Sequence, residues 1–158
     1  MRTFIIILGF LFPTLLYSEA GFEFGCDQME SSFAEHNKRS TLIGNAYVIT
    51  GSLNIKSDKI ELYGQDYRFA QCSGGVVTLI QIKVRIINED LVCRSDFAEY
   101  NSDKNTLVLT GDPIVYKGND VFRASKINID LDNNDIVMEG NVKGNITDKE
   151  KAEKKTEE

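Results

Sequence analysis

Short hydrophobic runs, rich in Val, Ile, Leu, Thr and Tyr, dominate residues 40–147 and are interrupted by Gly, Asn and Asp. Within these runs apolar and polar residues alternate, which is the period of a β-strand with one buried face. The interruptions recur roughly every 8 to 12 residues, and no stretch keeps a helical period near 3.6. The pattern predicts an all-β domain with strands at Thr41–Thr50, Leu53–Lys56, Lys59–Leu62, Arg68–Ala70, Val76–Leu79, Lys83–Ile87, Leu91–Cys93, Phe97–Glu99, Thr106–Thr110, Ile114–Lys117, Val121–Ala124, Lys126–Leu131, Asp135–Glu139 and Asn141–Ile146.

The N-terminal segment has a different pattern, that of an export signal. A basic start at Arg2 precedes an apolar run over Phe4–Leu16, and small residues follow at Ser18 and Ala20. This order predicts a secretory signal peptide over residues 1–20. The run is shorter than the roughly 20 apolar residues that a membrane-spanning helix needs, so we expect cleavage rather than a retained anchor.

The rest of the chain divides into three parts. Residues 21–39 mix aromatic with polar side chains and are predicted to be a loosely structured lead-in. Residues 40–147 form the predicted β-domain, which is large enough for one hydrophobic core. Residues 148–158 alternate acids with lysines and bury too little apolar surface to offset the entropy of ordering, so we expect a disordered tail.

An internal repeat connects the two halves of the predicted domain. The segment Gly44–Gly51 recurs as Gly111–Gly118, 67 positions later. A weaker copy begins at Gly74, and a clearer one at Gly140. A hairpin unit of this kind cannot bury its apolar face alone, so its copies must pair into one continuous sheet. Without a gap, the same offset pairs Ile55 with Phe122, Lys59 with Lys126, Ile60 with Ile127, and Leu62 with Ile129.

Each clear copy begins with Gly followed by Asn or Asp. These pairs are Gly44-Asn45, Gly111-Asp112 and Gly140-Asn141. Glycine adopts a positive φ without strain, and Asn and Asp adopt it more readily than other residues. The pairs are therefore predicted to bend the strands where the sheet folds over.

The same stretches carry a family resemblance. Ala98-Glu99-Tyr100, Leu107–Pro113, Ala124–Asp130 and Gly140-Asn141-Val142 match the patterns A-x-Y, L-x-L-x-G-x-P, A-x-x-I-x-I-D and G-N-V. Together they resemble the LptA/OstA-like lipopolysaccharide-transport family, over about residues 40 to 147. The chain departs from the family pattern in its degenerate second repeat and in the cysteines of its sheet.

The resemblance implies a fold and a function. The fold would be an open, folded-over antiparallel β-jellyroll, with two facing sheets built from the repeated hairpin units. The function would be that of a periplasmic bridge, which carries lipopolysaccharide or a related envelope lipid from an inner-membrane partner to an outer-membrane partner. Edge strands near Thr41–Thr50 and Asn141–Ile146 would join these partners, or further copies of the chain end to end.

Alternating apolar positions are the candidate lipid contacts. From the residues alone they would form an ordinary closed sandwich core, whereas the resemblance favours an apolar groove for acyl chains. Lipid head groups are expected to face solvent, and Lys59, Arg123 and Lys126 are expected to be surface charges. The candidates are Val48, Ile55, Ile60, Leu62, Val115, Phe122, Ile127 and Ile129.

Two other functions fit the pattern. A secreted structural or adhesive protein would use the same repeat to build a closed core. The inner-membrane-anchored partner of the transport system would share the fold and keep its N-terminal segment as an anchor.

Composition limits the partners, metal sites and catalytic groups that the chain is expected to have. With 24 acidic against 18 basic residues the net charge is −6, which argues against nucleic acid as a partner. Cys26, Cys72 and Cys93 form no C-x-x-C pair and His36 is the single histidine, so neither a metal site nor a cofactor is predicted. A Cys72–Cys93 disulfide and free thiols both remain open. No nucleophile motif is present, so we do not expect an enzyme.

Overall fold

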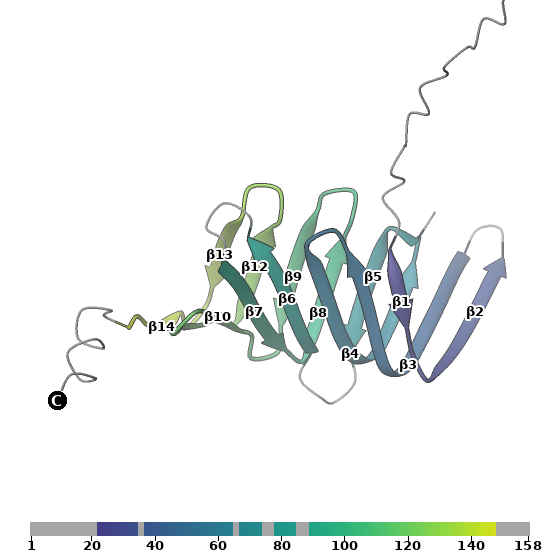
Figure 1. Cartoon of the computed structure of the whole chain (residues 1–158), viewed down its shortest axis with the longest axis horizontal. Helices are drawn as coiled ribbons and strands as arrows, with labels where there is room; N and C mark the ends of the chain where they lie inside the picture. The colour runs from purple at the N-terminus through teal and green to yellow at the C-terminus, as the bar shows by residue number, and fades with distance from the viewer. Residues whose placement is uncertain (1–21, 35–36, 65–66, 74–77, 85–88, 148–158) are drawn as a thin grey trace, which may run out of the picture.

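The computed structural model describes residues 22–34, 37–64, 67–73, 78–84 and 89–147, and most of these lie in antiparallel β-strands of one sheet (Figure 1). No helix in this part of the chain has the length and apolar character that a membrane crossing requires. The strands are β1 (Glu23–Gly25), β2 (Gln28–Ala34), β3 (Asn37–Thr50), β4 (Leu53–Tyr63), β5 (Phe69–Ser73), β6 (Thr78–Val84), β7 (Glu89–Ser95), β8 (Phe97–Asn101), β9 (Thr106–Thr110), β10 (Ile114–Lys117), β11 (Asp120–Arg123), β12 (Lys126–Asp130), β13 (Asp135–Glu139) and β14 (Lys143–Asn145).

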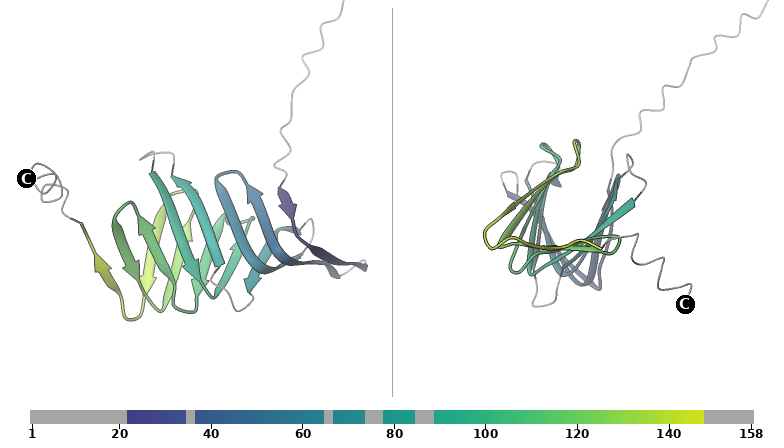
Figure 2. Two further views of the ribbon diagram at one scale, coloured as in Figure 1. Left: turned by 60° about the horizontal axis from the view of Figure 1, so that its bottom comes forward. Right: turned by 90° about the vertical axis from the view of Figure 1, so that its left-hand side faces the viewer.

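Strands β3 and β4 form a long bent hairpin that belongs to two halves of the sheet. The first part of β4 pairs with β6 and the second part with β5. We call the half that contains β2, β5, β8, β9, β12 and β13 limb A, and the half that contains β1, β6, β7, β10, β11 and β14 limb B. The sheet curls so that the limbs face each other in an open half-barrel (Figure 2). The predicted β-jellyroll is confirmed.

The Gly-Asn and Gly-Asp pairs stand where the chain passes between the limbs. Gly44 and Asn45 have φ values of 73° and 45°, and the pairs at Gly111 and Gly140 have similar positive values. Each glycine carbonyl accepts a hydrogen bond from a backbone amide of the preceding corner, at Asp27, Asp96 and Ser125. The predicted bends at these pairs are confirmed, whereas the weaker copy at residues 74–76 lies outside the described residues.

The lead-in differs from its prediction. Residues 23–25 and 28–34 are strands β1 and β2, which pair with β3 on the side away from β4. All side chains of β2 are exposed, so the segment carries no burial pattern, and the backbone ladder to β3 holds it in the sheet. As a result, Thr41–Thr50 is not a free edge, and its prediction as a joining edge was wrong. The predicted signal peptide and tail lie outside the described residues.

Two predicted strands are one strand in the structure. Leu53–Lys56 and Lys59–Leu62 both belong to β4, which continues through the corner at Ser57 and Asp58. The hydroxyl of Ser57 donates to the Ser73 carbonyl, 3.0 Å away. Strands β9, β10 and β13 have the predicted bounds.

Candidate functional site

The inner face of limb B carries a row of side chains that runs from one end of the sheet to the other. Directly paired residues on neighbouring antiparallel strands project from the same face, so the strand register defines the row. We call it the limb B row. Its members are Phe24, Val48, Ile55, Ile80, Cys93, Val115, Phe122 and Gly144.

Limb A contributes two more rows to the same interior. The first limb A row comprises Met29, Leu42, Ile60, Cys72, Ala98, Leu109, Ile127 and Met138. The second comprises Ser31, Ser40, Leu62, Ala70, Tyr100, Leu107, Ile129 and Ile136. None of the three rows contains a charged residue, and the limb B row and the first limb A row contain no polar side chain, whereas the second limb A row begins with Ser31 and Ser40.

The predicted lipid contacts all belong to these rows. Val48, Ile55, Val115 and Phe122 lie in the limb B row, and the other four lie in the limb A rows. Seven of them are between 0 and 3% exposed, and Phe122 is partly exposed. The 67-residue repeat offset identified these eight residues. It could not identify inner-face residues of strands that do not repeat at that distance.

Several inner-face residues were not predicted. Leu42, Ile80, Leu107 and Leu109 are fully buried in the same rows. The alternation Leu107-Val108-Leu109 was a signal that could have identified the last two, because alternate residues of a strand share a face.

Burial changes along the rows. Leu42, Ile55, Ile80 and Leu109 are 0% exposed in the middle, where the rows of both limbs form one hydrophobic cluster. At the β1 and β2 end, Phe24 is 40% exposed and Met29 is 46% exposed. At the other end, Phe122 and Met138 are only partly buried. The apolar interior is therefore covered in the middle and accessible at both ends.

A cavity of about 230 Å³ opens at the end formed by the N-terminal strands. Its apolar wall includes Val48 and Leu62, two of the predicted contacts. The polar part of the lining includes Arg68, whose guanidinium lies 2.9 Å from the Asp103 carboxylate. The Tyr67 hydroxyl accepts a hydrogen bond from Ser40, at 3.2 Å. The complete lining is Phe22, Val48, Thr50, Leu62, Tyr67, Arg68, Ala70, Tyr100 and Ser102.

The interior thiols are neutral and unpaired. Cys72 and Cys93 are free and buried, so the disulfide alternative is not the one in this structure. Burial raises the pKa of each thiol to about 12, because desolvation disfavours the thiolate. Within the described residues, no three His, Cys, Asp or Glu side chains are grouped as a metal site would require.

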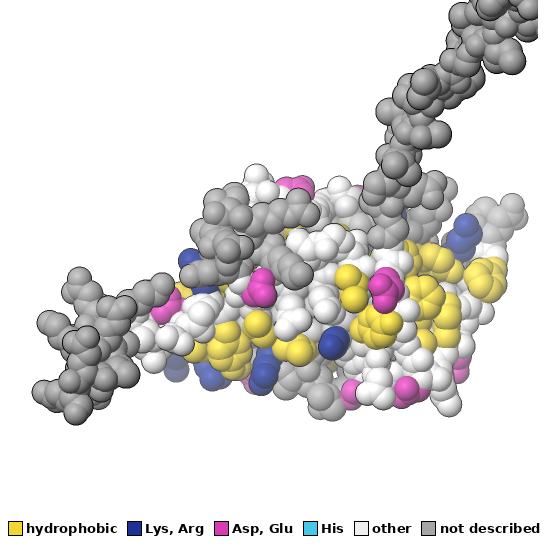
Figure 3. Space-filling view, viewed as in Figure 1, with side chains coloured by type: hydrophobic (Ala, Val, Ile, Leu, Met, Phe, Trp, Pro, Cys, Tyr) yellow, Lys and Arg dark blue, Asp and Glu magenta, His cyan; other side chains and the backbone are white. Residues whose placement is uncertain are grey.

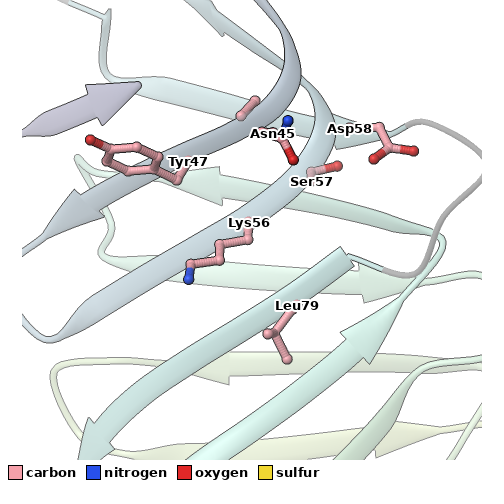
Figure 4. Close-up of a pocket in the computed structure, with 7 residues that line it drawn as sticks. Asn45, Tyr47, Lys56, Ser57, Asp58 and Leu79 are labelled. Carbon is pink, nitrogen blue, oxygen red and sulfur yellow. The ribbon is translucent and has the colours of Figure 1, made fainter. Parts of the chain in front are cut away.

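A second cavity, of about 330 Å³, lies at the corner of β3 and β4 (Figure 4). Unlike the three interior rows, its lining includes charged side chains. Lys56 and Asp58 bring opposite charges to it, and Leu79 on β6 forms an apolar part of its wall. The other lining residues are Asn45, Ala46, Tyr47 and Ser57.

Comparison with known proteins agrees with the fold. Residues 27–135, more than half of the chain, match the family model described as LptA/(LptD N-terminal domain) LPS transport protein. Among solved structures, LptH from Pseudomonas aeruginosa, described as the LptA-homologous periplasmic component of the lipopolysaccharide transport device, matches with a TM-score of 0.74. The two are 14% identical, and the match covers 82% of this chain and 97% of LptH. No curated protein sequence matches the chain.

Proposed function

The chain belongs to the LptA and LptD N-terminal-domain family of lipopolysaccharide transport proteins, and on this premise we propose that it is a periplasmic bridge that carries lipid through its interior. The cargo is lipopolysaccharide or a related envelope lipid, moving from the inner to the outer membrane. The observation that carries this proposal is that the limb B row and the first limb A row carry an apolar inner face across the strands of each limb, and that this face becomes accessible at both ends.

The energetics of acyl chains suit this interior. Each buried methylene group contributes about 0.8 kcal/mol, so an acyl chain gains affinity in proportion to the length it inserts. Val48, Ile55, Ile60, Leu62, Val115, Phe122, Ile127 and Ile129 are proposed as contacts for the chain. Because the middle of the interior is closely packed, entry of lipid requires the two limbs to move apart along the open side.

The free strand edges provide the proposed joints. β13 and β14 each have a paired neighbour on one side only, at the C-terminal end of the sheet. β1 and β2 occupy the corresponding positions at the other end. Unpaired backbone groups on such edges invite pairing with another chain, so we assign the contacts with membrane partners or further copies to these four strands.

A closed structural protein is the second candidate. The 0% exposure of Leu42, Ile55, Ile80 and Leu109 is what a permanently filled sandwich core would also have. In that protein the side chains in the middle of the interior, such as Ile127, would stay out of reach of lipid under any condition.

Photocrosslinking distinguishes the two. Phe24 and Phe122 are replaced in turn by benzoylphenylalanine, and Ile127 by an aliphatic diazirine residue of similar size. Phe97, which is 53% exposed on the outer face of limb A, provides a matched aromatic control. Each folded variant is irradiated with lipopolysaccharide vesicles and analysed by mass spectrometry.

Adducts at Phe24, Phe122 and Ile127 but not at Phe97 would support passage through the interior. Adducts at the two ends without any at Ile127 would contradict passage and indicate binding at the ends. Equal labelling at Phe97, or no labelling at the interior positions, would favour the closed structural protein.

A further inference from the structure

An aromatic pair joins the two limbs near the N-terminal end of the half-barrel. Phe22 precedes β1 in limb B, and Tyr67 lies between β4 and β5 in limb A. The two ring centroids are 6.4 Å apart in an edge-to-face arrangement, in which aromatic rings attract each other. By contrast, the stacked rings of Tyr63 and Phe69, 5.3 Å apart, both belong to limb A. We call Phe22 and Tyr67 the aromatic clasp.

The strand register places the clasp on the open side of the half-barrel. β3 and β4 bend between the limbs, so their last residues, Thr50 and Tyr63, lie at the free rims of limb B and limb A (Figure 2). Phe22 adjoins the first rim, since β1 pairs with the last part of β3. Tyr67 adjoins the second rim, between Tyr63 and β5. Their contact therefore closes the gap between the rims at this point.

Both clasp residues line the cavity of about 230 Å³ at the N-terminal end. The two limbs share its apolar wall, with Val48 from the limb B row and Leu62 and Ala70 from the second limb A row. These rows continue into the covered middle of the interior. The cavity is therefore a short route from the open side to the apolar interior, and the clasp lies across this route.

Tyr67 is held firmly on limb A. Its hydroxyl accepts a 3.2 Å hydrogen bond from Ser40, and the carbonyl of the next residue, Arg68, accepts a 2.9 Å hydrogen bond from the Ser102 amide. The Arg68 guanidinium also lies 2.9 Å from the Asp103 carboxylate. Tyr67 has a φ of 54°, a conformation that costs a bulky residue free energy and persists only where its surroundings impose it.

Phe22 is held less firmly than Tyr67. β1 is three residues long and pairs with β3 alone, whereas β5 pairs with β4 on one side and β8 on the other. With the signal peptide predicted over residues 1–20 removed, Phe22 is also the second residue of the exported chain. Short edge strands and chain ends open at lower cost than strands paired on both sides. Phe22 is therefore the part of the clasp that can move.

Accessible apolar side chains lie at the same end of the molecule. Phe24, Met29 and Phe33 are 40%, 46% and 74% exposed. Hydrophobic side chains gather at the right-hand end of Figure 3, where β1, β2 and β3 lie in Figure 1. Exposed apolar patches are typical of surfaces that contact membranes, proteins or ligands. A lipid therefore meets apolar surface before it reaches the cavity.

We propose that the N-terminal cavity is a side entry for lipid acyl chains, which opens when Phe22 moves away from a fixed Tyr67. The inference rests on the proposed function, because it concerns how lipid reaches the same interior. An acyl chain that enters here contacts Val48 and Leu62 directly, without passing along the sheet from its end. The lipid head group stays outside the open side. Recognition at this step is of the acyl chain, since the wall between the limbs contributes apolar contacts.

Stopped-flow fluorescence tests the side entry. The protein is residues 21–158, which contain every described strand, and the probe is a monomeric single-chain phospholipid with an environment-sensitive fluorophore on its acyl tail. Phe22→Ala removes the movable ring. Tyr63→Ala is the matched control, because it removes a ring contact within limb A. In a further variant, Phe22→Cys/Tyr67→Cys with Cys26→Ser, a short bismaleimide crosslinker joins the two positions and locks the clasp.

We expect Phe22→Ala to accelerate both uptake and release of the probe about tenfold, the factor that corresponds to loss of an edge-to-face contact, with little change in affinity. The locked protein should lose the rapid uptake that the same variant has before crosslinking. Unchanged rates in Phe22→Ala, an equal acceleration in Tyr63→Ala, or undiminished uptake by the locked protein would overturn the proposal. If lipopolysaccharide still crosslinks to Ile127 in that case, the transport function stands and only the side entry fails.

Discussion

The backbone amide of Asp96 donates a 3.0 Å hydrogen bond to the carbonyl of Gly111, joining two successive corners of the folded sheet. A Cβ atom placed on Gly111 would lie 2.6 Å from the Asp96 Cβ. The corner thus requires glycine for two reasons, its positive φ of 75° and its close contact with Asp96 in the preceding corner.

Gly111→Ala should lower the free energy of unfolding more than alanine does at a glycine whose added Cβ would meet no neighbouring atom. Left-handed backbone alone costs a non-glycine residue about 1–2 kcal/mol, and the clash with Asp96 adds to this. Gly118→Ala is the matched control, because Gly118 has a φ of 57° with nothing within 4 Å of the added Cβ. Urea unfolding measures both, and equal losses would mean that the contact with Asp96 does not matter.

Leu109→Ala should lower the free energy of unfolding by about 2–5 kcal/mol, since it leaves a cavity in a closely packed interior. Val137→Ala, at a side chain that is 54% exposed, should cost about 0.5 kcal/mol or less. Denaturant unfolding of both variants tests the packing between the limbs. A small loss for Leu109→Ala would indicate that the limbs are already apart in solution.

The buried thiols should make the fold less stable in alkali. The pKa of Cys72 and Cys93 is about 12 in the fold and near 9 in the unfolded chain. The contribution of the neutral thiols to the free energy of unfolding is therefore complete below about pH 9, and it is lost as the pH rises towards about 12. We expect the pH dependence of unfolding to flatten in that range for the Cys72→Ala/Cys93→Ala variant. Cys26→Ala, at a partly exposed site, is the comparison. An unchanged slope in the double variant would contradict the assignment.

The pKa of the Glu61 carboxyl group should be lower than that of an ordinary glutamate. The hydrogen bond from Lys59 is the main cause of its lowered pKa, and the charges of Lys59 and Arg39 act in the same direction. Lys59→Gln should therefore raise the Glu61 pKa towards its usual value, as measured by NMR titration. Lys126→Gln should leave it unchanged. Because the folded pKa is lowered, this contribution to stability is present above the unfolded pKa and is lost as the pH falls through the folded one.

Much of the fold could be predicted from local pattern. Turn-forming residues flank β9 and β13, and alternation defines their buried faces, so their bounds were predicted correctly. β2 could not be found in this way, because all its side chains are exposed and only backbone pairing with β3 holds it. β4 was divided in two because Ser57-Asp58 has the composition of a turn, although the strand bends there without ending.

The site was predictable only in part for a related reason. The repeat and the alternation identified residues of the inner face, such as Ile60 and Ile127, because alternation records which side of a strand faces inwards. How closely the limbs approach depends on corner geometry between distant strands, so the packing of the middle was not predictable. Which side chains lie opposite one another depended on the register of strands that are not adjacent in sequence, such as β4 with β6 and β7 with β10.

The corner at Asp96 and Gly111 recurs at Ser125 and Gly140, with both residues 29 positions further along. Such a unit adds two strands to each limb, and neighbouring strands are about 4.8 Å apart, so 29 residues extend the molecule by roughly 10 Å. Its cross-section depends only on contacts between adjacent units. The reach of this protein is therefore a modular quantity: one inserted or deleted unit would change the distance it spans by a fixed step while leaving the shape of its interior intact.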